Sequence, residues 1–315
     1  MKFDALINIK KAISTLNPNE VRAMSERPLR VALHASSGDA FNRLENFFLR
    51  DLSPGRRRHS AQLLTRAPLS NLSSPADLDV YDEGTLAGGQ TVAPRNALIF
   101  HGDRPNQFVY KALSQHPDLG VVLAKSFHPF RRPFVERVIA KTCRENTLFS
   151  VATALPDVLP SLIELPWAVA EFASDTAFLT MNQVRMAFLI AAASDREVGY
   201  LDQKSEIAMV IGSAFGWRAI ARQLVGKIPF GGGLIGKAAV AYAGTKVLGL
   251  SLDHYYSIGF TYTREERDKL YADAFRQGKK IALKMLKFMR PDMAARFAGE
   301  AVRSQPPMIA PPARL

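Results

Sequence analysis

The chain has 315 residues, 47% of them hydrophobic, with a formal net charge of +12 and an estimated pI of 9.9. This hydrophobic share is enough to bury a core in one or two domains, and it excludes disorder of the whole chain. The single cysteine, Cys143, excludes an internal disulfide and a cysteine-rich metal site. The positive excess favours an acidic partner, which is anionic lipid, nucleic acid or an acidic protein surface.

The N-terminus, MKFDALINIKKAIST, lacks the unbroken apolar region and the small-residue cleavage site of a signal peptide. The sequence also offers no window of roughly 18 uncharged apolar residues, which a membrane-spanning helix needs. We therefore expect a cytoplasmic protein, with peripheral attachment to the inner membrane as a further option.

Residues 1–26 are expected to form two N-terminal helices. In residues 2–16 the apolar side chains recur on one side, between lysines. Such a helix either lies on a membrane surface or packs against the rest of the protein. A second helix is expected to start after Asn17, which can cap it, with Pro18 at its first position.

Residues 27–130 alternate short apolar runs with helical patterns, which is typical of a small parallel sheet and its helices in a three-layer α/β domain. The expected strands are 29–33, 78–81, 97–100 and 120–123, and the expected helices are 39–49 and 106–115. Segment 53–77 is rich in Pro, Ser and Arg and is expected to be mostly loop, with an edge strand near 62–65. The run Arg56-Arg57-Arg58 within it is either a solvated loop or a phosphate-binding spot.

The candidate ligand site follows the first strand, where a P-loop nucleotidase cradles phosphate with backbone amides. The candidate cofactor-binding residues are Ser36, Ser37, Gly38 and Asp82. Asp82 resembles a magnesium-side aspartate, but Asp39 and Ala40 stand where a P-loop has its lysine and its Ser or Thr. Because Asp39 would repel phosphate, we expect no efficient NTP hydrolysis, no catalytic residues and no cofactor.

The six histidines show no metal-ligand spacing, so no metal site is expected. His34 and His101 both follow predicted strand ends, which is the side where α/β folds bind ligands. They either share a pocket or are two unrelated loop residues.

Residues 131–260 are expected to form a helical domain. The polar residues within its apolar pattern are Asp175, Asn182, Gln183 and Arg185. A buried polar group needs a partner, so these residues are expected to form an internal network, with a binding role as the alternative.

The stretch at residues 228–250, IPFGGGLIGKAAVAYAGTKVLGL, is apolar on nearly every side and is interrupted only by Lys237 and Lys246. A helix without a polar face is either buried centrally or meets a bilayer. Residues 205–226 are expected to be the other arm of a helical hairpin, with a glycine hinge at residues 231–233.

Residues 261–303 are expected to form basic amphipathic helices. Thr263 to Glu266 is a capping box, and the helix behind it is expected to end before Pro291. Because lysines lie opposite its apolar side, this helix either binds anionic lipid or packs on its own domain with a solvated lysine face. The expected membrane or partner contacts are Lys237, Lys246, Lys279, Lys280, Lys284 and Lys287. Residues 304–315 are expected to be disordered.

Four features in the helical half carry a resemblance to a known bacterial family. They are Leu165-Pro166 with Phe172–Asp175, Leu179 to Met186, Ala219 to Phe230, and Gly236 to Gly249. In their order and spacing they resemble the YcjF-type domain of unknown function, which often follows a GTP-binding domain in the same chain. The resemblance implies a helical hairpin domain that tends to associate with membranes, and a degenerate GTPase-like or Rossmann-like domain at residues 27–130.

We therefore predict a non-catalytic membrane-peripheral or scaffolding protein, a pseudo-GTPase fused to an apolar helical hairpin domain. The alternative is a nucleotide-binding or nucleotide-sensing protein, or a divergent NTPase, that uses the α/β domain. The expected partners are an anionic membrane surface or another protein, with a homo-oligomer as a further option. Basic residues without interleaved aromatics disfavour nucleic acid.

Overall fold

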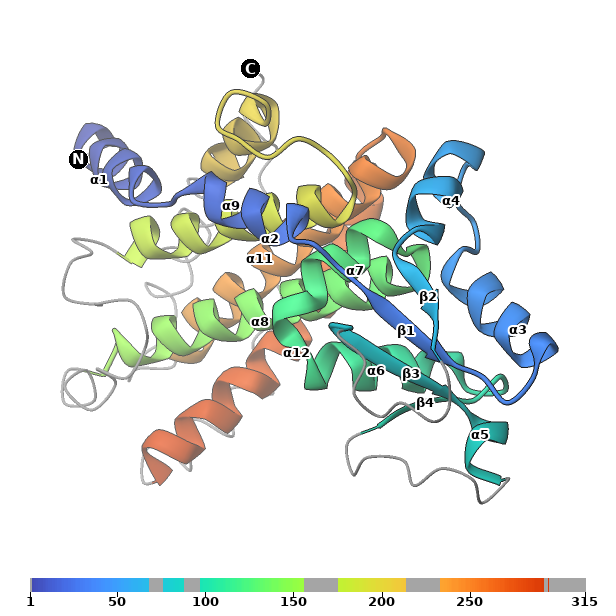
Figure 1. The fold of residues 1–315 in the computed structure, drawn as a ribbon. Helices are drawn as coiled ribbons and strands as arrows, with labels where there is room; N and C mark the ends of the chain where they lie inside the picture. Colours follow the sequence, from blue (N-terminus) through green and yellow to red (C-terminus); the bar gives the residue numbers. More distant parts are fainter. Residues whose placement is uncertain are drawn as a thin grey trace. The chain divides into compact units, whose positions relative to one another are not determined.

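The computed structural model describes residues 2–67, 76–87, 97–155, 175–213, 233–291 and 294 (Figure 1). The chain divides into two compact units. The helical unit comprises Met1–Pro18, Arg137–Ala191 and Glu197–Leu315, and the sheet unit comprises Asn19–Glu136 and Ala192–Arg196. The predicted fold class, a small parallel α/β domain together with a helical domain, is confirmed.

The sheet unit contains four parallel strands in the order β2-β1-β3-β4 (Figure 1). They are β1 (Val31–His34), β2 (Leu64–Arg66), β3 (Leu78–Asp82) and β4 (Leu98–Phe100). Val31 pairs with Leu64 on one side and with Leu78 on the other. The strand order therefore reverses between β1 and β3, and open α/β sheets bind ligands at the carboxyl ends of the strands that flank such a reversal.

The core of the sheet unit contains a cluster of phenylalanines. Helix α3 (Gly38–Phe48) buries residues three to four positions apart, which is one face of a helix, and α6 (Pro105–Gln115) does the same. The cluster consists of Phe47, Phe48, Phe100, Phe108, Phe127 and Phe130. Its contacting rings lie 4.7 to 6.4 Å apart, mostly edge to face, the arrangement that aromatic pairs prefer. The remaining helices of this region are α2 (Pro18–Glu26), α4 (Pro54–Ala61), α5 (Glu83–Ala87), η1 (Pro117–Leu119) and α7 (Gly120–Ser126).

The prediction of a strand at residues 120–123 is wrong, because this segment is the start of α7. A short apolar run does not distinguish a strand from a buried turn of helix. All residues from Gly120 to Ala124 are buried, so they leave no polar side from which a helical period can be read.

The prediction that residues 53–77 are mostly loop is wrong for α4, which includes Arg56-Arg57-Arg58. Pro54 stands in the first helical turn, and basic residues occupy the last turn, where they complement the helix dipole. The Pro-rich and Arg-rich composition concealed this pattern. The edge strand expected near 62–65 is β2, one or two residues later.

The helical unit is built from long helices. They are α1 (Lys2–Ser14), most of α8 (His128–Ala152), most of α9 (Asp175–Ala193), residues 204–213, α11 (Gly233–Ile258) and α12 (Arg264–Met289). The α1 helix packs on its own unit: Ile9 and Ile13 are buried, and the Tyr200 hydroxyl donates to the carbonyl of Ile13 (2.6 Å).

Helices α11 and α12 pack against each other along their length and are joined by the turn at residues 259–263 (Figure 1). Gly259, with φ of +83°, supplies the left-handed conformation that this turn requires. The predicted capping box is confirmed: the Thr263 hydroxyl accepts from the Glu266 amide, and Glu266 accepts from the Thr263 amide (2.8 Å). The helix ends at Met289, before Pro291, as predicted.

Several predictions fall on residues outside the described ranges. They are the hairpin arm beyond residue 213, the hinge at 231–232, the resembling segments at 165–174 and 219–230, and the tail at 304–315. The part of 228–250 that the structure describes, from Gly233 on, is helical.

Candidate functional site

The four predicted cofactor-binding residues lie at the carboxyl edge of the sheet, between β1 and β3. Ser36 follows β1, and Asp82 is the last residue of β3. Ser37 is the N-cap of α3, where its hydroxyl accepts from the Ala40 amide (3.1 Å), and Gly38 is the first residue of that helix. The structure thus brings Ser36 and Asp82, which are 46 positions apart in the chain, to the point where the strand order reverses.

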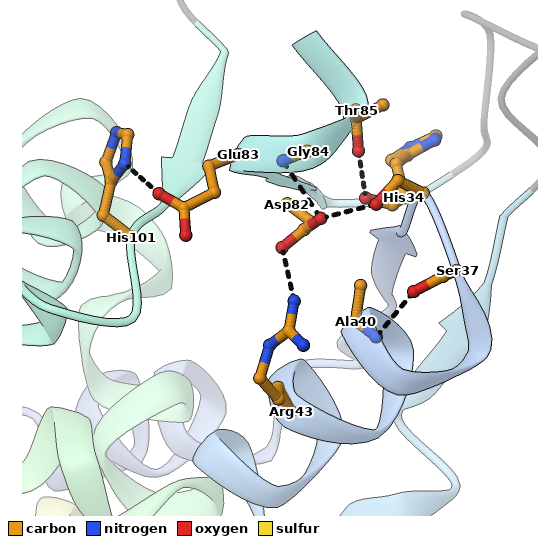
Figure 2. Close-up of polar contacts among 10 residues, drawn as sticks. His34, Ser37, Ala40, Arg43, Asp82, Glu83, Gly84, Thr85 and His101 are labelled. Carbon is orange, nitrogen blue, oxygen red and sulfur yellow. Dashed lines mark hydrogen bonds and ion pairs between the residues drawn. The ribbon is translucent and has the colours of Figure 1, made fainter. Parts of the chain in front are cut away.

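Asp82 is only 4% exposed, and its carboxylate is occupied by neighbours from the same unit. Its Oδ2 accepts from the Ser36 hydroxyl (2.8 Å) and from the Gly84 amide (3.1 Å). Its Oδ1 lies 3.7 Å from Nη2 of Arg43, which extends from α3 towards it in Figure 2. Both carboxylate oxygens therefore face protein donors, and the balancing positive charge is a guanidinium.

Gly84 is required by this close packing. A Cβ at this position would lie 2.6 Å from the Ser36 Oγ and 2.9 Å from the Asp82 Oδ2. Real Cβ atoms do not come so close, so any side chain here would displace Ser36 or Asp82. The Ser36–Asp82–Gly84 contacts form one small, tightly fitted cluster.

The arrangement differs chemically from a nucleotide-hydrolysing loop. A magnesium-side aspartate needs carboxylate oxygens that reach the ion or its waters, whereas Oδ2 of Asp82 already accepts from Ser36 and Gly84, and its Oδ1 faces the Arg43 guanidinium at 3.7 Å. Asp39 lies in the first turn of α3, where a carboxylate complements the helix dipole that would otherwise attract phosphate.

His34 and His101 do not share a pocket in the described residues. His34 is buried, its ring stacks on Tyr81 (4.4 Å between centroids), and its Nε2 lies 2.8 Å from the Asp79 Oδ1. Burial, and then the charge of Asp79, raise the pKa of Tyr81 above its usual value. His101 follows β4 and is exposed, and Figure 2 shows the two histidines on opposite sides of Asp82.

One group of exposed residues at this edge has the spacing of metal ligands. Glu83, His101 and Asp103 each offer one ligand atom, all within 4.8 Å of one another. The His101 Nδ1 lies 3.0 Å from the Glu83 Oε2, while Arg104 donates to Asp103 (2.9 Å). A cation here would have to displace both of these pairs.

The six predicted contact lysines fall into two sets. Those of α11 are partly buried: Lys246 donates to Gln277 Oε1 (2.6 Å) and lies over the Tyr242 ring, and Lys237 is half-buried. Lys279 of α12 is also half-buried, over the Phe275 ring, and burial followed by the charge of Arg276 lowers its pKa. Lys280, Lys284 and Lys287 are exposed on α12.

The helical unit contains a buried polar network that links three helices. Thr245 Oγ1 accepts from Asn146 Nδ2 (2.9 Å) and from Gln183 Nε2 (3.0 Å), and Asn182 donates to Asn146 Oδ1 (3.0 Å). The predicted internal network is thus confirmed for Asn182 and Gln183. Its partners Asn146 and Thr245 were missed. Thr245 is a polar residue in an apolar helical pattern, which is the signal that found the other two, whereas Asn146 stands beside Arg144 and Glu145 and carries no such signal.

Arg43 and Gly84 were also missed. The signal for Gly84 is its place two residues after the aspartate that ends β3, where the backbone approaches closely. Arg43 carries no such signal, since an arginine on an amphipathic helix is usually solvated. Its role follows only from the packing of α3 beside β3.

The chain matches no family model, no curated protein and no solved structure. The resemblance to the YcjF-type domain therefore stays a prediction.

Proposed function

We propose that the chain is a non-catalytic, membrane-peripheral or scaffolding protein that binds an anionic surface through residues 276–290, the end of α12 with its C-cap Arg290, which we call the basic segment of α12. This segment contains six basic residues and no acidic residue. The preceding part of the helix, residues 264–275, carries both signs. The concentration of positive charge at one end of one helix is the observation that carries the proposal.

The packing of α12 supports the proposal, because it leaves the charges outside. The buried residues of the helix recur every three or four positions and face α11; they are Tyr271, Ala274, Phe275, Gly278, Ala282 and Leu286. Lys280, Lys284 and Lys287 therefore stand in solvent, and the neighbouring Phe288 is 90% exposed. Exposed cations beside an exposed aromatic ring are the composition of a membrane-surface helix.

The attachment we propose is superficial, without insertion of α11. Among the described helices, one window, Thr176–Ala193 in α9, reaches the length and mean hydropathy (1.2) of a membrane span, and 78% of it is buried in the protein. The core helix of a soluble protein passes the same test. The apolar side chains of α11 are likewise buried against their own unit.

The occupied carboxylate of Asp82 supports the non-catalytic part of the proposal. Its Oδ2 already accepts from Ser36 and Gly84, and its Oδ1 lies 3.7 Å from the Arg43 guanidinium, so a magnesium ion would have to compete with these groups for the carboxylate. We therefore assign the Asp82 edge of the sheet unit a structural role, within a pseudo-GTPase domain.

Vesicle flotation tests the proposal. The full chain should float with phosphatidylcholine vesicles that contain phosphatidylglycerol, and not with phosphatidylcholine alone, since each basic residue near an anionic surface contributes about 1 kcal/mol. Added salt should release it, because the Debye length falls to about 3 Å at 1 M. The variant Lys280→Gln/Lys284→Gln/Lys287→Gln should lose flotation.

A matched control removes the same charge elsewhere. Lys141, Lys204 and Lys269 are exposed and lie outside the basic segment. The variant Lys141→Gln/Lys204→Gln/Lys269→Gln should float like the parent chain. Equal loss of flotation in both variants would mean that net charge alone drives binding. If the parent chain did not float either, the proposal would be wrong.

The reversal point between β1 and β3 favours nucleotide sensing as the second candidate. Ser36, Ser37 and Gly38 lie where doubly wound sheets hold phosphate. Calorimetry with GTP and ATP at millimolar concentration tests this candidate. The variant Gly38→Pro removes a backbone amide at the start of α3. Binding heat that this variant abolishes would support nucleotide sensing, and no binding heat from the parent chain would exclude it.

A further inference from the structure

The amino end of the sheet, opposite to the Asp82 cluster, carries a cavity of about 510 Å³. Its floor is the chain entering β1 and β2, and its sides are α4, α7 and Asp195. All of these residues belong to the sheet unit. The cavity volume lies within the roughly 300–1,000 Å³ of typical small-molecule sites.

The charges around this cavity are unevenly matched. Arg56 of α4 and Lys125 of α7 share a single carboxylate, that of Asp195: Arg56 donates to its Oδ2, and the Lys125 Nζ lies 3.8 Å from its Oδ1. The lining as a whole carries three cations, Arg27, Arg56 and Lys125, and two carboxylates, Glu26 and Asp195. Arg27 also pairs with Asp77 and Asp118, and His59 lies one helical turn beyond Arg56 on the same wall.

Asp195 supplies, from the protein itself, the carboxylate that pairs with both cations. It follows the end of α9 with φ of +54°, a left-handed conformation that aspartate and asparagine tolerate better than most residues. Its carboxylate fills the space between two basic groups on two different helices. Both side-chain cations remain accessible, with Arg56 at 42% and Lys125 at 30% exposure.

The lining beside the charged groups is partly polar, with Ser25, Ser60 and Ser126, and partly apolar, and its apolar part sets the kind of anion. Pro28, Leu29, Leu63 and Val122 line the cavity beside the basic groups. A bare phosphate would fill only the charged end, whereas a phosphate ester with a compact apolar body would fill both ends. We propose that this cavity binds a small soluble organic phosphate, with the phosphate between Arg56 and Lys125 in competition with Asp195.

Binding of phenyl phosphate to the full chain, measured by calorimetry and ligand-observed NMR, tests the proposal. Phenyl phosphate should bind, and both inorganic phosphate and phenol should bind about tenfold more weakly, because each fills only one end. Arg56→Gln and Lys125→Gln should each weaken binding about tenfold, which is the effect of one lost charge-assisted hydrogen bond. No binding of phenyl phosphate at millimolar concentration would overturn the proposal.

Two further variants separate the site from general charge. Arg58→Gln removes the same charge from the same helix, at a residue that does not line the cavity, and should change affinity less than about twofold. Asp195→Asn keeps the left-handed backbone and removes the competing carboxylate, so it should strengthen binding. Weakening by Asp195→Asn, or equal effects of Arg58→Gln and Arg56→Gln, would contradict the proposed site.

A last comparison identifies the source of the phosphate. The chain is first bound to phosphatidylcholine vesicles that contain phosphatidic acid, and phenyl phosphate is then added. If the natural ligand is a soluble ester, phenyl phosphate should not release the chain from these vesicles. Displacement that Arg56→Gln abolishes would assign the cavity to a lipid headgroup instead and would overturn the soluble ligand. If the proposal for the cavity fails, the proposed role of the basic segment of α12 is unaffected, because the two sites belong to different units.

Discussion

Helices α11 and α12 have the same length, 26 residues, and lie against each other, but they relate to solvent in opposite ways. In α11, 17 residues are buried, around much of its circumference, whereas α12 buries 6, along one stripe. The more apolar helix is therefore the core of the unit, and the amphipathic helix presents the charge. An apolar sequence by itself does not mark the part of a protein that meets lipid.

Reactivity of Cys143 tests whether α11 stays in the core, and it has the largest expected effect. The thiol is fully buried, 3.6 Å from the Tyr242 carbonyl of α11, and burial raises its pKa to about 12. At pH 8 a disulfide reagent should label the native chain about a thousandfold or more slowly than the unfolded chain, as expected from ordinary folding free energies. Rapid labelling of the native chain would mean that α11 readily leaves the core.

The variant Gly278→Val tests the close packing of α12 on α11. A Cβ at Gly278 would lie 2.9 Å from the Tyr242 Cβ and 3.0 Å from the Ala239 backbone. Overpacking should lower the free energy of unfolding by about 3 kcal/mol, measured by urea denaturation. Gly212→Val is the matched control, since Gly212 is also helical but has no atom of the described residues within 4 Å of its Cβ position. Equal losses in both variants would exclude close packing as the cause.

The variant Thr245→Val tests the polar network that holds α11 to α8 and α9. It keeps the shape of the side chain but leaves the Asn146 and Gln183 amides without their shared acceptor. The expected loss is about 2 kcal/mol, the cost of unsatisfied buried donors. Thr180→Val should cost less, because the Thr180 hydroxyl donates to the Thr176 carbonyl of its own helix. If Thr245→Val left the free energy of unfolding unchanged, the apolar residues alone would account for the stability of this helix contact.

The capping box gives the smallest expected effect and concerns the exposed start of α12. Hydrogen bonds from the Thr263 amide and hydroxyl lower the pKa of Glu266 below its ordinary 4.5. A lowered folded pKa means that the stabilisation is complete above the ordinary value and is lost as the pH falls through the folded value. The difference in urea midpoint between the parent chain and Glu266→Gln should therefore be present at pH 7 and vanish near pH 2. A difference that is unchanged by acid would exclude the cap as its source.

Much of the fold was predictable because its signals are local. The alternation of apolar runs and helical patterns marked β1, α3, β3, β4 and α6, and the Thr263 capping box marked the start of α12 to the residue. The error at α7 arose because a fully buried helix has no polar side and therefore no readable period. The error at α4 arose because Arg-rich composition outweighed the proline at its start.

The candidate site was predictable only in part. Residues after parallel strands must meet at one edge, so the proximity of Ser36 to Asp82 followed from the strand pattern. The Asp82 contacts with Arg43 and Gly84 depend on how α3 packs and how the chain turns after β3, which no local pattern encodes. Arg56 and Lys125, which pair with Asp195, precede it by 139 and 70 positions in the chain, and rules of residue spacing do not predict contacts over such separations.

Hydrogen exchange of the chain on anionic vesicles tests the central claim most directly. The account predicts slower exchange at residues 276–290 when vesicles with phosphatidylglycerol are added, because the basic segment becomes covered. Exchange in 233–258 should stay slow and unchanged, because α11 remains in the core. Faster or altered exchange in 233–258, with 276–290 unaffected, would contradict the account and make α11 the element that meets the membrane.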